Sequence, residues 1–60
     1  MPPKPAEVLR RALRDGWVIV GGKGSHRKLW KDGKYLVIPY HTKELKKGMW
    51  EQIRRDAGWR

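Results

Sequence analysis

The stretch HRKLWKDGKYLVIP, residues 26–39, decides the fold that this sequence predicts. It contains two runs, HRKLWK and KYLVIP, joined by Asp32 and Gly33. An Asp-Gly pair between two such runs is a strong signal for a β-hairpin, because both residues tolerate the positive φ angles that a two-residue turn requires. We therefore expect antiparallel strands over residues 26–31 and 34–39.

This turn also fixes which residues lie opposite each other. The expected pairs are Lys31–Lys34, Trp30–Tyr35, Leu29–Leu36, Lys28–Val37, Arg27–Ile38 and His26–Pro39. Directly opposed residues share one side of a sheet. The core side then holds Leu29, Leu36 and Ile38. The other side holds His26, Lys28, Trp30, Tyr35 and Val37. A register slipped by one residue would bury an unpaired lysine, which is costly, so we prefer the first register.

Helices are predicted near both ends of the chain, and one more strand precedes the hairpin. Residues 5–15 begin with a proline, repeat apolar residues at helical spacing and stop before a glycine. The apolar face of this helix is Val8, Leu9, Ala12 and Leu13. Residues 17–20, WVIV, have the composition of a strand, and the GGKGS that follows is a turn. Residues 49–57 form the second helix, with Met49, Trp50, Ile53 and Ala57 on its apolar face.

The order α-β-β-β-α predicts a single domain over residues 1–60. A sheet of three consecutive antiparallel strands with both helices on one face is an α+β two-layer sandwich. The second face of the sheet then has no helix to cover it, so its side chains indicate what the sheet is for.

The chain is short and strongly basic. Its 60 residues include 15 lysines and arginines against 6 acidic residues, a formal net charge of +9. Such a charge predicts a polyanionic partner such as a nucleic acid or an acidic protein. The longest apolar run is far too short to cross a bilayer, and no signal-peptide pattern is present, so we expect a cytoplasmic protein with no membrane partner. Without cysteine, and without side chains spaced as a ligand set, we expect no metal and no cofactor.

His26 is the strongest candidate for chemistry. It follows a glycine-rich turn through which a phosphate can approach the backbone, and Lys23 in that turn is a candidate RNA- or phosphate-binding residue. Ser25 can donate a hydrogen bond, and Arg27 and Lys28 can hold a phosphate. Imidazole titrates near neutral pH, which suits proton transfer. A single histidine at a strand start is more often a surface or structural residue, so the residues alone leave both interpretations open.

Further candidates lie on the open face and before the second helix. Trp30 and Tyr35 can stack on unpaired RNA bases, although a cross-strand aromatic pair also stabilises a hairpin. Lys46 and Lys47 precede a helix N-terminus, where phosphate is favourably bound, although a solvated loop explains them equally. His41 is a candidate second acid or base, and a loop residue bonded to its own backbone is the simpler interpretation.

Three segments in order, KPAEVLRRALRDGW, GSHRKL and YLVIPYHTKELKKGMWEQIRRDAG, resemble the HicA (YcfA-like) toxin family. The resemblance covers residues 4–58, and GSH and P-x-H-x-x-x-L-x-x-G are its most specific parts. It implies a double-stranded-RNA-binding-domain-like fold and an mRNA interferase of a bacterial toxin–antitoxin system, with His26 as the catalytic residue. It also implies a HicB-type antitoxin that binds the toxin and covers the site. Two residues depart from the family pattern: Trp17 replaces the usual Phe, and Met49 replaces a Thr or Ser that would cap the last helix.

The resulting hypothesis is metal-independent cleavage of mRNA. His26 removes a proton from a ribose 2′-OH, Arg27 and Lys28 stabilise charge on the phosphate, and Trp30 and Tyr35 hold flanking bases. The acid that protonates the leaving group stays unassigned. A non-catalytic RNA-binding module of the same fold, or a small basic protein that binds only an acidic partner, are the alternatives.

Overall fold

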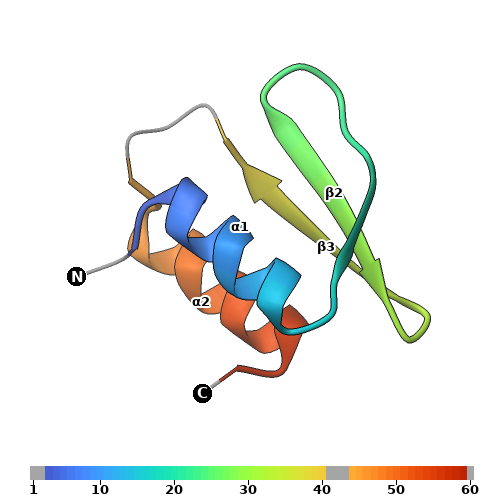
Figure 1. Ribbon diagram of the computed structural model, residues 1–60. Helices are drawn as coiled ribbons and strands as arrows, with labels where there is room; N and C mark the ends of the chain where they lie inside the picture. Colours follow the sequence, from blue (N-terminus) through green and yellow to red (C-terminus); the bar gives the residue numbers. More distant parts are fainter. Residues whose placement is uncertain (1–2, 41–43, 60) are drawn as a thin grey trace.

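The computed structural model describes residues 3–40 and 44–59. Its elements are α1 (Pro5–Arg14), β1 (Val18–Gly21), β2 (His26–Lys31), β3 (Lys34–Pro39) and α2 (Lys47–Ala57). The strands form one antiparallel sheet in the order β1-β2-β3. Figure 1 shows α1 and α2 together on one side of that sheet. The predicted α+β class, the α-β-β-β-α order and the double-stranded-RNA-binding-domain-like arrangement are confirmed.

The hairpin between β2 and β3 has the predicted register. Every expected pair is present, from Lys31 opposite Lys34 to His26 opposite Pro39. The turn residues have positive φ angles, 49° at Asp32 and 78° at Gly33, as a two-residue hairpin turn requires. The residues buried on the helix side are Leu29, Leu36 and Ile38. The residues exposed on the other side are His26, Lys28, Trp30, Tyr35 and Val37.

The core lies between the helices and the sheet. Its members are Val8, Ala12, Trp17, Leu29, Leu36, Ile38, Leu45 and Ile53. Each leucine or isoleucine buried there stabilises the fold by about 1.5–3 kcal/mol. Trp17, predicted in a strand, is instead a buried linker residue whose backbone N–H donates to the Ala12 carbonyl at 3.0 Å, and β1 starts one residue later.

The predicted apolar faces of the two helices are partly wrong. In α1 the side chains of Val8 and Ala12 are buried, but Leu13 is exposed because it lies about 100° round the helix from that row. In α2 the side chain of Met49 is 44% exposed, contrary to prediction, while Ile53 is buried. The buried stripe of each helix is therefore narrower than its run of apolar residues.

The start of α2 also differs from the prediction. The helix begins at Lys47 rather than at residue 49, and Lys46 occupies the N-cap position without a side-chain hydrogen bond. Met49 is the third residue of the helix, so its departure from the family pattern does not remove a cap at that position. No helix within the described residues is long and apolar enough to cross a membrane.

Strand β1 is an edge of the sheet. It pairs with β2 from Val18 opposite Trp30 to Gly21 opposite Lys28, and a bulge interrupts the register after Ile19. Val18 pairs with Trp30 and is exposed on the face opposite to the helices. Ile19 pairs with Leu29 on the helix side, and it is exposed because the helices pack against β3, at the far edge of the sheet. A bulge and a short length are common ways of limiting unwanted pairing at such an edge.

Candidate active site

The uncovered face of the sheet carries a continuous strip of aromatic and basic side chains. Val18, Trp30 and Tyr35 form one row across the three strands. Trp30 is 40% exposed and Tyr35 is 56% exposed, so both rings are accessible. The Lys28 Nζ lies 4.4 Å from the centroid of the Tyr35 ring, within the range of a cation–π contact. A cation and two accessible rings therefore share one surface.

His26 lies at the end of this strip. It is the first residue of β2, and its alternation with Lys28 and Trp30 places the three side chains on the same face. The imidazole is exposed, and the backbone N–H of His26 donates to the Lys23 carbonyl at 3.2 Å. The structure thus brings the predicted catalytic histidine, the predicted phosphate-binding lysine and the predicted stacking residues together.

The glycine-rich segment before His26 packs against the strand backbone. Gly22 has a φ angle of +140°, and a Cβ atom on it would lie 2.2 Å from the His26 carbonyl oxygen and 3.2 Å from the Arg27 Cα. The distance to the carbonyl oxygen is too short for any Cβ atom, and the positive φ angle also disfavours a side chain, so this close approach requires glycine. The segment therefore contacts the peptide that follows the candidate catalytic residue.

Arg27 does not belong to the strip. It pairs with Ile38, so its side chain leaves β2 on the side opposite to His26. Its Nη1 donates to the Gly24 carbonyl at 3.0 Å, and its guanidinium carbon lies 5.0 Å from the centroid of the Tyr40 ring. The guanidinium therefore contacts the turn that precedes His26 and the ring of Tyr40.

The other predicted site residues divide by position. Lys23 and Ser25 are exposed in the turn that precedes His26. Lys46 and Lys47 are exposed at the start of α2, which packs on the helix-covered face, away from the strip. The first turn of α2 has no acidic residue to offset these lysines at the positive end of the helix dipole. His41 lies outside the described residues.

Sequence reasoning missed the part played by Tyr40. Its backbone N–H donates to the Ser25 carbonyl, which extends the β2–β3 pairing by one step beyond His26 and Pro39. The signal was available, because continuing the hairpin register past residue 39 places Tyr40 opposite Ser25. The position of the ring under Arg27 had no such signal, since strand alternation does not reveal where a long side chain ends.

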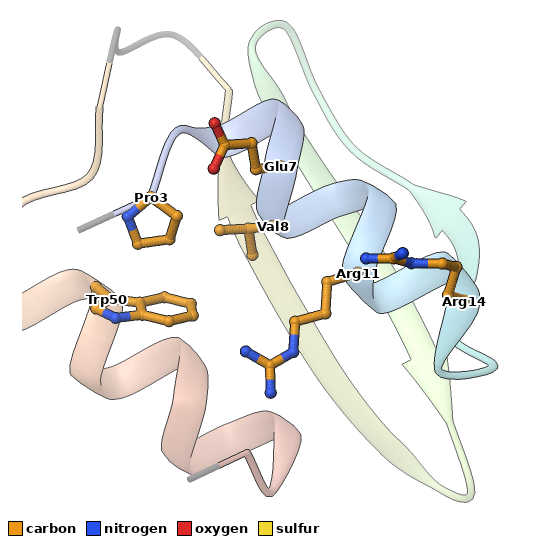
Figure 2. A pocket seen from close by; sticks show the side chains of 6 residues that line it. All are labelled: Pro3, Glu7, Val8, Arg11, Arg14 and Trp50. Carbon is orange, nitrogen blue, oxygen red and sulfur yellow. The ribbon is translucent and has the colours of Figure 1, made fainter. Parts of the chain in front are cut away.

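One surface hollow, of about 250 Å³, lies between α1 and α2, away from the strip. Figure 2 shows this hollow, with Arg11 extending from α1 toward α2. Its lining residues are Pro3, Glu7, Val8, Arg11, Arg14 and Trp50. None of the predicted site residues lines it. Within residues 3–40 and 44–59 no three His, Asp or Glu side chains are grouped so as to hold a metal ion, so there is no ligand set to assign.

Two comparisons find related proteins. A family model described as the HicA toxin of bacterial toxin-antitoxin matches residues 5–59. A chain in a solved structure, a toxin-antitoxin complex from Streptococcus pneumoniae, is 36% identical and superposes with a TM-score of 0.80, over 95% of this chain and 98% of that one. No curated protein sequence matches. The family match and the structural likeness both extend over nearly the whole chain, including the strip and the turn before it.

Proposed function

Since the chain belongs to the HicA toxin family of bacterial toxin–antitoxin systems, we propose that it is an mRNA interferase, an endoribonuclease that uses His26 as its general base. The observation that supports this proposal is the position of His26 and Lys28 together on the sheet face opposite to α1 and α2. Exposed rings on the same face give unstacked bases a surface to bind. A substrate strand can reach all of these groups from one side.

The proposed reaction needs one base and a source of positive charge. The His26 imidazole takes the proton of a ribose 2′-OH, and the 2′ oxygen attacks the adjacent phosphorus. The bond from phosphorus to the 5′ oxygen breaks, which gives a 2′,3′-cyclic phosphate and a 5′-OH. Lys28 stabilises the negative charge that develops on the phosphate oxygens. The leaving oxygen takes its proton from an acid for which His41 stays the candidate, and the mechanism uses no metal.

The RNA is held by stacking and by charge. Trp30 and Tyr35 stack on the bases that flank the cleaved bond, and each stacked base contributes about 1–3 kcal/mol to binding in comparable sites. Lys23 and Ser25 contact the sugar–phosphate backbone from the turn. Lys46 and Lys47 bind phosphate outside the strip, because α2 lies on the other side of the sheet.

The same face is the proposed site of the antitoxin. Exposed apolar side chains on an otherwise basic surface are characteristic of a face that a protein partner covers, and Val18, Val37 and the two rings are such side chains here. A HicB-type antitoxin seated there excludes RNA from His26. We place both proteins in the cytoplasm, where mRNA is available.

The test is digestion of RNA by the purified chain. We expect fragments that end in a 2′,3′-cyclic phosphate, formed equally in the presence of a chelator. His26→Ala should cleave at least ~100-fold more slowly while it still binds RNA, because one positioned base contributes ~10²–10⁴-fold. Normal cleavage by His26→Ala would refute the assignment, and sensitivity to the chelator would refute the metal-free mechanism. Salt-sensitive RNA binding without any cleavage would identify a non-catalytic RNA-binding module.

A further inference from the structure

We propose that Arg27 is a positioning residue, which fixes the turn that presents His26 and does not bind the RNA phosphate. The proposal rests on the proposed function, because it concerns how the base of that reaction is held. It changes the role that the sequence alone predicts for Arg27, whose place next to His26 in the chain suggests a phosphate ligand. Adjacent residues in a strand point to opposite faces, and the guanidinium therefore starts on the wrong side of the sheet for a phosphate at His26.

The contacts of Arg27 account for its orientation. Nη1 donates to the Gly24 carbonyl at 3.0 Å and lies 3.4 Å from the His26 carbonyl oxygen. The guanidinium carbon lies 5.0 Å from the centroid of the Tyr40 ring. The Arg27 side chain thus connects β2 both to the turn at Gly24 and to Tyr40, which follows β3. Arginine suits this position because its planar group can donate along its edge while its face stacks on a ring.

Backbone contacts make the turn sensitive to that side chain. Tyr40 donates its N–H to the Ser25 carbonyl, and His26 donates its N–H to the Lys23 carbonyl. Gly22 packs directly on the His26 carbonyl. Hydrogen bonds therefore hold the backbone on both sides of His26. Loss of the hydrogen bond between Arg27 and the Gly24 carbonyl should shift the backbone of His26, and with it the position of the imidazole.

A small displacement of a catalytic base has a large kinetic effect. Misplacement by about 1 Å can lower a rate ~100-fold, even when the altered residue does not touch the substrate. A lost phosphate contact has a different signature: it weakens RNA binding and reduces the slope of log K against log salt by about 0.7 for a single strand. The two roles are therefore separable by experiment.

The decisive variant is Arg27→Lys, which keeps the charge but loses the planar group. We expect kcat to fall about 10- to 100-fold with KM within about twofold of the wild type. Arg27→Gln, which also removes the charge, should leave the salt slope unchanged, whereas the loss of a phosphate contact would reduce it. Tyr40→Leu should show the same pattern, and the double variant should be no slower than the slower single variant, since both changes break one arrangement. Lys34→Ala, which removes a lysine at the other end of the hairpin, is the control for an altered surface charge, and it should leave kcat unchanged.

A measurement without RNA separates this proposal from the proposed function. In NMR spectra, Arg27→Lys should shift the backbone amides of residues 23–26 and the imidazole signals of His26, whereas Lys34→Ala should not. If the wild type cleaves no RNA, the proposed function fails and these shifts alone decide the role of Arg27. Wild-type kcat and unshifted signals in Arg27→Lys would overturn the positioning role, as would a raised KM with a smaller salt slope in Arg27→Gln. If Arg27→Lys does not fold, Tyr40→Leu gives the same comparisons.

Discussion

The indole Nε1 of Trp59 donates a 3.1 Å hydrogen bond to Oδ2 of Asp15, joining residues 44 positions apart in the chain. The same carboxylate oxygen lies 3.3 Å from the Nζ of Lys31. The centroid of the Trp59 ring lies 4.4 Å from the guanidinium carbon of Arg11 and 6.2 Å from the centroid of the Trp50 ring. Asp15 therefore connects the end of α1, the end of β2 and the segment after α2. A chain of this size buries a small core, so such a connection matters to its stability.

The Trp59–Asp15 hydrogen bond is predicted to stabilise the native state. Trp59→Phe keeps an aromatic ring but removes the donor, so its unfolding midpoint should fall below that of the wild type. Trp59→Ala also removes the contacts with Arg11 and Trp50, and its midpoint should fall further. Thermal denaturation followed by circular dichroism measures both. A Trp59→Phe midpoint equal to that of the wild type would show that the ring contacts alone hold this segment.

The same carboxylate predicts a pH dependence of stability. The Trp59 hydrogen bond, and next to it Lys31, hold the pKa of Asp15 below its usual value of 3.8. A carboxyl whose pKa is lower in the folded state stabilises that state above the unfolded pKa, and this contribution is lost as pH falls through the folded pKa. The difference in unfolding free energy between wild type and Asp15→Asn should be constant near neutral pH and shrink below pH ~4. A difference that is independent of pH down to pH 2 would contradict this.

Gly22 is predicted to be intolerant of any side chain. Gly22→Ala places a Cβ atom against the His26 carbonyl and demands a φ angle of +140° that alanine rarely adopts. We expect a loss of unfolding free energy of at least ~1 kcal/mol, together with slower RNA cleavage. Gly48→Ala is the matched control, because a Cβ atom there meets nothing within 4 Å and the residue lies in α2. That control should be neutral or stabilising by up to ~1 kcal/mol, measured by urea denaturation.

The hairpin shows what the sequence predicts well and why. Asp32-Gly33 strongly favours a two-residue turn, and that turn determines the register, so the two faces of β2 and β3 follow from local chemistry. The burial of a helix residue and the direction of a long side chain depend on contacts with distant parts of the chain, so local chemistry does not determine them. The sequence alone does not reveal that Met49 is exposed, because a row of apolar residues on a helix is wider than the stripe that its neighbours bury. Nor does it reveal that Arg27 turns back onto Tyr40, because a flexible side chain takes its direction from the fold.

The aromatic row is predicted to bind RNA bases. Trp30→Ala and Tyr35→Ala should each weaken binding of a short single-stranded RNA by about 1–3 kcal/mol, because each removes one stacking surface. Fluorescence anisotropy at fixed salt measures the affinity, since the salt concentration alters every such value. Leu13→Ala removes an exposed apolar side chain on α1, outside the strip, and should leave the affinity unchanged. Because the two rings also stabilise the hairpin, each variant is compared at a temperature at which it is folded. If both folded variants bind RNA with wild-type affinity, the two rings have only a structural role and RNA binds outside this face.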